Sequence, residues 1–375
     1  MKIGINLLQY TDVQGIEIYA HNLLSSVFAN DNRNTYILFV NQKSASIFDF
    51  QFPNVIKKEL KLKSLSKNYL IFFQQLIFPF ILKREKIDLL FCPSLAMPLF
   101  YGSKVVTILD CAFARFRDEA AGISRIYIKL ACLSAKFFSK GVVTISKFSK
   151  KEITKIIGIK EDKILAIYGG VPRLLVPNAN ETNQTLKKFN LIGQDNSIKK
   201  YFFCIGNFRP RKNIARLIKS FSLLAQKKED CYLVLAGKVE KRFFDVYAEI
   251  DNYNLRDRIL YLGVVGDMEK SVLYQNCVAV TFCSLYEGMG LPILEGQYFS
   301  APIITSNVSS LPEVSGQGAL LVDPYDVLEI SQAMERLLID DNLRTELIER
   351  GSANMTRFSW DQSAKELITL FEKNK

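Results

Sequence analysis

The sequence predicts an α/β protein with two doubly wound domains, each a parallel sheet covered by helices on both faces. Two observations predict this class. Short, continuous apolar runs alternate with helical patterns along the chain, and a polar stretch near the middle interrupts the alternation before it restarts. The length of 375 residues agrees with this prediction, because a single core rarely grows so large.

The first domain is expected to span residues 1–171. Its first strand, Lys2–Leu8, leads through a loop ending near Gly15 into a helix over Ile16–Ala29. A second helix is expected over Tyr69–Arg84 and a third over 146–157. Further strands are expected at Thr35–Val40 and in the runs "IDLLFCPS" (87–94), "SKVVTILD" (103–110), "GVVTIS" (141–146) and "KILAIYGGV" (163–171). Since no G-x-G-x-x-G follows the first strand, a nicotinamide dehydrogenase is disfavoured.

Residues 172–199 are polar and contain Pro, Asn and Gly, which is typical of a linker. Strand and helix signals then alternate again over a second domain, residues 200–355. An amphipathic helix from Trp360, within residues 356–375, is expected to cross back to the first domain. We expect two such Rossmann-like domains to face each other across a cleft at the carboxyl ends of their strands, where open α/β sheets bind ligands.

The cysteine and histidine content disfavours a zinc site. The seven cysteines include no CxxC pair, and the chain has a single histidine, His21. The cysteines lie mostly in apolar runs, which indicates small core residues in a reducing compartment. The first residues show no signal peptide, and no apolar run is long enough to span a bilayer. These features predict a cytoplasmic protein.

The net charge of +11 is unevenly distributed. Residues 1–170 contain 24 Lys and Arg against 13 Asp and Glu, whereas residues 171–375 contain 25 of each. A one-sided basic field attracts a membrane surface, a lipid phosphate or a nucleic acid, but a lysine-rich solvated surface explains the same count. No nucleic-acid-binding motif is present, so that partner is not expected. Five lysines precede the apolar run Tyr69–Leu82 and suggest peripheral attachment to a membrane: Lys57, Lys58, Lys61, Lys63 and Lys67.

Two segments of the second domain carry the candidate chemistry. In "SLYEGMGLPILEGQYFSAPIITSNVSSLPEV" (284–314), Glu287 lies in a glycine-containing loop before a helix expected to start at Pro292, with Glu295 in its first turn. Backbone N–H groups at such a helix start favour a phosphate. In "FCIGNFRPRKNIARLIKSF" (203–221), three cations follow a strand and suit a diphosphate: Arg209, Arg211 and Lys212.

Taken together, "GNFRPRKN", "SLYEGMGLPILEG", "SNVSSLPEV" and "ALLVDP" resemble the C-terminal half of family 4 retaining glycosyltransferases of the GT-B fold, such as bacterial polysaccharide and lipopolysaccharide glycosyltransferases. Glu287 and Glu295 match the paired glutamates of that family. "TISKFSKKEI", "YGGV" and "FSW" also fall where its patterns expect them, so the resemblance covers nearly the whole chain.

The resemblance implies a role for each matching residue. Lys212, with Arg209 or Arg211, would neutralise the leaving diphosphate of the donor. Glu287 would contact the donor sugar, and Glu295 would hold the nucleotide ribose. The backbone of Gly288, Met289, Gly290 and Leu291 would meet sugar or phosphate, and Gly15 would approach the phosphates from the first domain. Asp110 would complete a catalytic set with Glu287 and Lys212, although Leu109 stands where the family has a histidine.

The reaction implied is transfer of a sugar from a nucleotide-diphosphate sugar to a hydroxyl of a glycan or lipid-linked acceptor, with retention at the anomeric carbon. No Asp-x-Asp occurs, so neither a metal nor another cofactor is expected, and cationic side chains would stabilise the diphosphate. The alternative in another class is a weakly active or inactive GT-B protein that holds an anionic lipid or polymer through its basic half. A nucleotide-sugar 2-epimerase shares the architecture but does not match the Glu287 segment.

Overall fold

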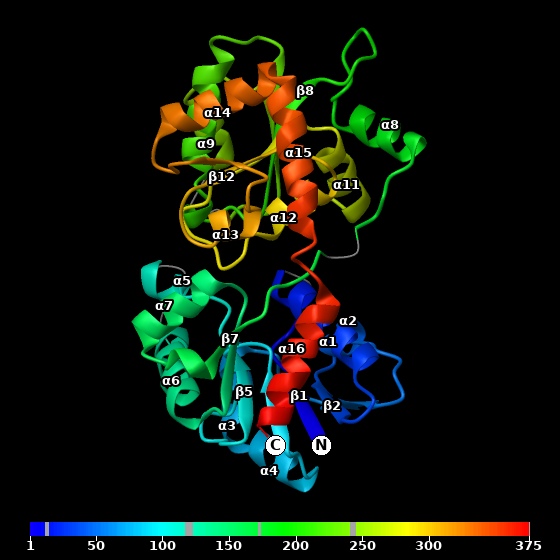
Figure 1. The fold of residues 1–375 in the computed structure, drawn as a ribbon, viewed down its shortest axis with the longest axis vertical. Helices are drawn as coiled ribbons and strands as arrows, with labels where there is room; N and C mark the ends of the chain where they lie inside the picture. The colour runs from blue at the N-terminus through cyan, green and yellow to red at the C-terminus, as the bar shows by residue number, and fades with distance from the viewer. Residues whose placement is uncertain (12–14, 117–122, 172–173, 241–244, 375) are drawn as a thin grey trace. The chain divides into compact units, whose positions relative to one another are not determined.

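The computed structural model describes residues 1–11, 15–116, 123–171, 174–240 and 245–374. The chain divides into two compact units (Figure 1). Unit 1 comprises Met1–Gly170 and Phe358–Lys375, and unit 2 comprises Val171–Arg357. Each unit has one sheet of parallel strands with helices around it, which confirms the α/β class.

The sheet of unit 1 has seven strands in the order β3-β2-β1-β4-β5-β6-β7. The central strand β1 pairs in parallel with two neighbours, so that Ile3 lies beside both Tyr36 and Leu89. The burial of these central strands explains their continuous apolar sequences. The strands are β1 (Lys2–Asn6), β2 (Thr35–Val40), β3 (Val55–Glu59), β4 (Leu89–Cys92), β5 (Lys104–Thr107), β6 (Gly141–Thr144) and β7 (Ile164–Ala166).

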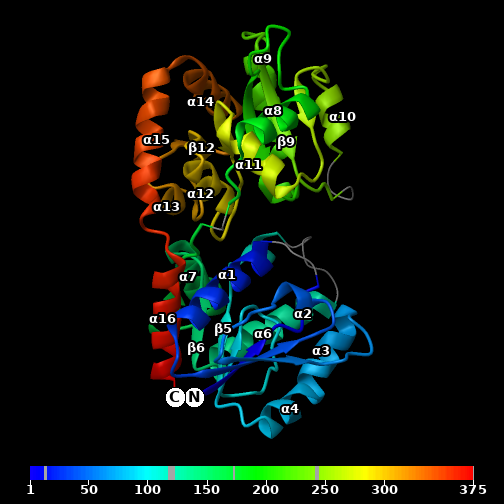
Figure 2. The same ribbon diagram turned by 90° about the vertical axis from the view of Figure 1, so that its right-hand side faces the viewer.

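Two apolar clusters cover the two faces of this sheet. One joins the sheet to α1 and α16, and the other joins it to α3, α4, α6 and α7. Figure 2 shows α16 on one side of β5 and β6, with α6 and α3 on the other. The helices are α1 (Gly15–Asn30), α2 (Ser44–Ile47), α3 (Lys67–Leu76), α4 (Phe78–Arg84), α5 (Ala112–Arg115), α6 (Ile123–Phe138), α7 (Lys147–Ile157), a 3₁₀ turn at Glu161–Lys163, and α16 (Trp360–Lys373).

The C-terminal helix α16 packs on α1 within unit 1. The ring of Trp360 lies 5.6 Å from that of Tyr19, and Ser26 donates a hydrogen bond to Asp361 at 2.6 Å. A Cβ atom on Gly169 or Gly170 would lie 3.0 or 2.6 Å from the indole of Trp360. The glycines of "YGGV" therefore leave room for the tryptophan of "FSW".

Unit 2 repeats the topology with six strands in the order β10-β9-β8-β11-β12-β13. The first strand, β8, lies between β9 and β11, so the strand order reverses at β8 and β11 as it does at β1 and β4 in unit 1. The strands are β8 (Lys200–Ile205), β9 (Cys231–Ala236), β10 (Ile259–Tyr261), β11 (Ala279–Phe282), β12 (Ile303–Ser306) and β13 (Leu320–Val322).

The helices of unit 2 follow the strands in the expected alternation and are α8 (Ala179–Lys188), a 3₁₀ turn at Pro210–Lys212, α9 (Ile214–Ala225), α10 (Val246–Asp251), α11 (Asp267–Gln275), α12 (Leu291–Tyr298), α13 (Leu311–Ser315), α14 (Val327–Ile339) and α15 (Asp341–Met355). Their apolar faces join the strands in a core that includes Phe202, Leu217 and Ile304.

Two local expectations were wrong. The helix expected over Tyr69–Arg84 is two helices, because Pro79 lacks the N–H that a continuous helix would need and its ring would clash with the carbonyl of Gln75. The segment expected to be a linker, 172–199, contains α8 and belongs to unit 2. Asn178 and Glu181 form a capping box at the start of α8, a signal within the polar composition. In the part of the chain that the structure describes, every helix is too short or too polar to traverse a bilayer.

Candidate functional site

The candidate site of unit 2 lies at the carboxyl ends of β8 and β11, where the strand order reverses. Two loops leave this edge. One follows β8 and contains the 3₁₀ turn Pro210–Lys212, and the other follows β11 and leads into α12. The amide of Leu285 donates to the carbonyl of Arg211 at 2.7 Å and joins the two loops. Open α/β sheets bind ligands at such a reversal, so the topology places both sequence segments at one position.

Three of the predicted residues form a buried ion cluster between these loops. The Lys212 ammonium donates to Oε1 of Glu287 at 2.5 Å, and Nη1 of Arg211 donates to Oε2 at 2.8 Å. Arg211 also donates to the carbonyl of Tyr286 at 3.1 Å. The Lys212 nitrogen lies 4.6 Å from the centre of the Phe282 ring. Glu287 is only 6% exposed, so its carboxylate holds both cations in place.

The surroundings shift the pKa values of this cluster. Burial would raise the pKa of Glu287, but the charges of Lys212 and Arg211 outweigh burial and lower it. Burial lowers the pKa of Lys212, and the neighbouring Glu287 opposes that shift. One carboxylate between two cations leaves a net charge of one positive. The carboxylate of Glu287 thus balances one of the two cations.

The loop from Glu287 to Leu291 is fixed by serines of the segment that follows β12. Ser310 donates to the carbonyl of Glu287 at 2.9 Å, and the Glu287 amide donates to Ser309 at 3.2 Å. Gly290 precedes α12 at a φ of +93°, and a Cβ there would lie 2.8 Å from Leu311. Glycine is needed at this position for both reasons. Gly288 and Met289 are buried, and Leu291 is the first residue of α12.

Glu295 is also buried, but its surroundings differ from those of Glu287. It is the fifth residue of α12, because the helix starts one residue before Pro292, so Glu295 begins the second turn and does not lie in the first turn as expected. Its carboxylate accepts a hydrogen bond from the Tyr274 hydroxyl at 2.8 Å and one from Lys270 at 3.2 Å. Sequence reasoning missed Lys270 and Tyr274. Their spacing of four residues on α11 places them on one helix face, but only the tertiary structure brings that face to Glu295.

Three further predicted residues are Arg209, Gly15 and Asp110. Arg209 pairs with Glu240 at 2.6 Å. Gly15 and Asp110 belong to unit 1. Gly15 is the exposed first residue of α1, next to residues 12–14, which lie outside the described part of the chain. Asp110 accepts a hydrogen bond from the Ala112 amide at 2.9 Å, and Leu109 packs against the core. The structure thus brings together Arg211, Lys212 and Glu287.

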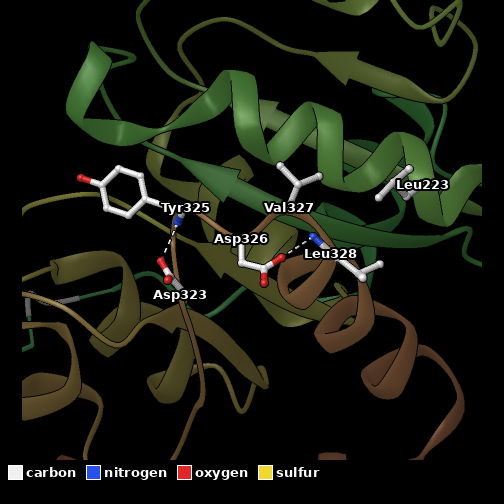
Figure 3. Close-up of a pocket in the computed structure, with 6 residues that line it drawn as sticks. All are labelled: Leu223, Asp323, Tyr325, Asp326, Val327 and Leu328. Carbon is white, nitrogen blue, oxygen red and sulfur yellow. Dashed lines mark hydrogen bonds between the residues drawn. The ribbon is translucent and has the colours of Figure 1, made fainter.

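A second feature of unit 2 is a surface hollow at the start of α14 (Figure 3). It is lined by Leu223, Asp323, Tyr325, Asp326, Val327 and Leu328. Asp326 caps α14 by accepting from the amides of Leu328 and Glu329 at 2.8 and 3.0 Å, so its carboxylate has a structural role. Among the residues that the structure describes, no three His, Cys, Asp or Glu side chains form a group able to hold a metal ion.

A chain of two Rossmann-like units has the architecture of the GT-B fold. In this chain the ion cluster lies at the strand reversal of the second unit. Among the solved structures that share this fold, two match over nearly their whole length. Sucrose-phosphate synthase from Thermosynechococcus elongatus has a TM-score of 0.76 at 18% identity, covering 99% of this chain and 98% of that chain. Anabaena HepE in complex with UDP has a TM-score of 0.75 at 16% identity, covering all of both chains.

The family comparison falls on unit 2. Residues 189–354 match the model of the glycosyl transferases group 1 family. The O-antigen chain mannosyltransferase B of Escherichia coli is 32% identical over 236 residues, which make up 62% of this chain and 61% of that relative. The match thus spans about three fifths of the relative's length. The chain thus has the GT-B fold, its second unit matches the group 1 glycosyltransferase model, and it resembles a bacterial O-antigen enzyme.

Proposed function

We propose that the protein transfers a sugar from a nucleotide-diphosphate sugar to a hydroxyl group of an acceptor. The observation that carries this proposal is the cluster of Lys212, Arg211 and Glu287 beside the start of α12, inside the group 1 domain. The complex of HepE with UDP supports a nucleoside-diphosphate ligand, because that protein has the same fold.

In the proposed reaction, the bond between the anomeric carbon and the donor phosphate oxygen breaks while a bond to the acceptor oxygen forms. Negative charge grows on the leaving diphosphate, and the net positive cluster stabilises it. The diphosphate accepts the proton of the acceptor hydroxyl, so no protein base is needed and the sugar is transferred with retention. Leu109 in place of a histidine is compatible with this route.

The donor would meet three parts of the site. Lys212 and Arg211 would face the diphosphate, and the amides from Gly288 to Leu291 would add the positive end of the α12 dipole. Glu287 would accept hydrogen bonds from donor-sugar hydroxyls while it keeps the two cations in place. Glu295, fixed by Tyr274 and Lys270, would accept bonds from the ribose.

The acceptor is proposed to be a growing glycan or a lipid-linked glycan at the cytoplasmic face of the membrane. The resemblance to an O-antigen mannosyltransferase supports a glycan acceptor, and the charge of residues 1–170 supports an acceptor near anionic lipid. The reaction is further proposed to need no metal ion, so transfer should persist in excess chelator. Complete loss in chelator with recovery on adding magnesium or manganese would contradict this part alone.

The proposed function is tested by a melting-temperature screen against common nucleoside diphosphates and their sugars, followed by a turnover assay with each compound that binds. A ligand at 100 times its Kd stabilises the folded protein by about 2.7 kcal/mol. We expect at least one donor to raise the melting temperature and to release nucleoside diphosphate on turnover, and we expect Lys212→Ala to reduce both effects. No stabilisation by any nucleoside diphosphate at millimolar concentration would contradict the proposal.

A further inference from the structure

Helix α6 of unit 1 exposes an apolar stripe on the face that turns away from the sheet. Its opposite face packs on the sheet through the small buried residues Ala131 and Ala135. A helix at the surface of a domain normally presents polar residues outward. Here the outward positions, spaced by four, three and four residues, are Ile126 at 62%, Leu130 at 47%, Leu133 at 50% and Phe137 at 67% exposure.

A loop between β4 and β5 extends this stripe. The ring of Phe100, 82% exposed, lies 5.8 Å from that of Phe138 at the end of α6. Hydrogen bonds fix the backbone of this loop. The buried Lys104 ammonium donates to the carbonyls of Pro98, Leu99 and Tyr101 at 3.0, 2.7 and 2.8 Å. The exposed position of Phe100 is thus fixed by the fold.

Helix α3 lies on the other side of the same loop, and α3 and α4 also expose apolar side chains. Gln75 of α3 bonds to Met97 and Leu99 at 3.0 and 2.8 Å, and Tyr127 of α6 bonds to Met97 at 3.0 Å. The loop therefore lies between α3 and α6 and joins them. Four further apolar side chains are exposed here: Phe72 at 51%, Leu76 at 54%, Ile77 at 40% and Phe80 at 75%.

Two sequence stretches that carry this apolar surface contain basic residues and no acidic ones. Residues 60–84, which include α3 and α4, hold five Lys and Arg, and residues 120–151, which include α6, hold seven. The chain has 38 acidic residues, yet none lies in either stretch. On α6, Arg125 and Lys129 are exposed beside the stripe. The surface thus combines exposed apolar side chains with cations. Amphipathic helices that lie in a membrane interface have the same combination.

We propose that this surface, formed by α6, Phe100, α3 and α4, docks on an anionic lipid bilayer, with its apolar side chains in the interface and its cations facing lipid phosphates. A second copy of the chain suits it less well. A twofold interface would place this basic patch against an identical basic patch, and like charges that meet at an interface oppose binding.

This surface replaces part of the attachment site suggested by the sequence. Of the five lysines before Tyr69, Lys57 pairs with Asp49 and Lys58 pairs with Glu85, so two of the five are neutralised within the fold. The inference deepens the proposed function, since it states where the chain would meet a membrane that carries a lipid-linked acceptor. Vesicle binding requires no donor and no turnover, so each proposal can fail without the other.

The test is co-sedimentation of the purified chain with vesicles of pure phosphatidylcholine and with vesicles that contain phosphatidylglycerol, at low and high salt. We expect binding to the anionic vesicles, weakened by salt because screening shortens the reach of the cations. The double variant Leu133→Ser/Phe137→Ser and the variant Lys129→Glu should each lower the partition coefficient, the double variant by about tenfold or more.

Matched controls come from unit 2. Leu328→Ser/Ile339→Ser on α14 removes apolar side chains that are 53% and 64% exposed, and Lys219→Glu reverses an exposed cation on α9. Neither control should change vesicle binding. The α6 variants should keep the circular dichroism spectrum, melting temperature and nucleoside-diphosphate affinity of the wild type, because all the replaced side chains are exposed.

Three outcomes would overturn the inference. The first is no binding to anionic vesicles, and the second is an equal loss of vesicle binding with the α14 control variant. The third is a dimer that forms without lipid as the concentration rises, seen in sedimentation velocity, and that Leu133→Ser/Phe137→Ser converts to a monomer. The last outcome would assign the surface to a second copy of the chain. If Lys212→Ala loses donor turnover but still binds vesicles, membrane docking is independent of the donor site.

Discussion

Units 1 and 2 share one strand order but differ in where their charged side chains lie and in how far these are buried. Unit 2 buries a carboxylate between two cations at its strand reversal, and Glu287 there is 6% exposed. Unit 1 carries the whole excess of positive charge and displays it beside exposed apolar side chains. In unit 1 an ion pair such as Lys58 and Glu85 lies at the surface, with the lysine 39% exposed. The same topology thus supports a buried, partly compensated ion cluster in one unit and a net basic surface in the other.

The largest difference is expected in stability. Glu287→Gln leaves Lys212 and Arg211 buried without their carboxylate, and breaking a buried pair typically costs about 3–5 kcal/mol. Glu85→Gln in unit 1 removes a surface pair and should cost about 0–1 kcal/mol. Chemical denaturation of both variants would measure the free energies of unfolding. Equal costs would mean that the Glu287 cluster is solvated and that the comparison fails.

The next effect concerns donor affinity. Lys212→Ala should weaken nucleoside-diphosphate binding by about 1.5–3 kcal/mol, as expected for the loss of a hydrogen bond to a charged group. Lys129→Ala removes an exposed cation of unit 1 and should leave that affinity unchanged. Isothermal calorimetry gives both values. A weaker affinity with Lys129→Ala would show that the net positive field, and not the cluster, attracts the donor.

A smaller effect is expected from the loop before α12. Gly290→Ala should destabilise the protein by about 1–3 kcal/mol, because alanine is strained at a φ of +93° and its Cβ would lie 2.8 Å from Leu311. Gly102→Ala in unit 1 has no atom within 4 Å of the new Cβ and should be nearly neutral. Melting temperatures of the two variants decide the point, and a neutral Gly290→Ala would show that the loop can rearrange.

The smallest effect is a pH dependence with a defined sign. The pKa of Glu287 is lower in the folded protein than its ordinary value of 4.5. Between these two values the unfolded chain binds more protons, so the free energy of unfolding rises with pH there. Stability from this group is complete above pH 4.5 and is lost as the pH falls through the lowered value. The variant Glu287→Gln should therefore lack the part of the decrease in unfolding free energy at low pH that comes from this group.

High salt sharpens the same contrast. The hydrogen bond from Lys58 lowers the pKa of Glu85, but the side chains of that pair are 39% and 20% exposed, so the pair should lose more of its contribution as ions screen it. The buried Glu287 cluster should keep its contribution. Acid unfolding curves at low and high salt would show this, and equal salt sensitivity of the two glutamates would contradict the assigned burial.

The sequence predicts much of the fold because buried parallel strands are continuous apolar runs, as in "IDLLFCPS" and "VAVTFC" (278–283). It did not predict β3, whose sequence is "VIKKE", because an edge strand that is half polar has no such run. It missed the break between α3 and α4, although Pro79 was a visible signal for it.

The candidate site shows the same limit. The sequence predicts that Glu287 and Lys212 lie near each other, because each belongs to a glycine-containing or charged segment that follows a strand at the same sheet edge. The sequence left open which cation pairs with which carboxylate. Arg209 lies only two residues from Arg211, yet it pairs with Glu240. Glu295 obtains its partners from α11, since tertiary packing places that helix beside α12.

The central claim is that the Glu287 cluster acts on the donor during transfer. The most direct measurement is the single-turnover rate of Glu287→Gln together with its nucleoside-diphosphate affinity, well below its melting temperature. Interactions made mainly in the transition state affect rate more than binding. We predict a rate lowered by about 100-fold or more, with affinity changed by less than about tenfold. Equal losses of rate and affinity, or an unchanged rate, would contradict the claim.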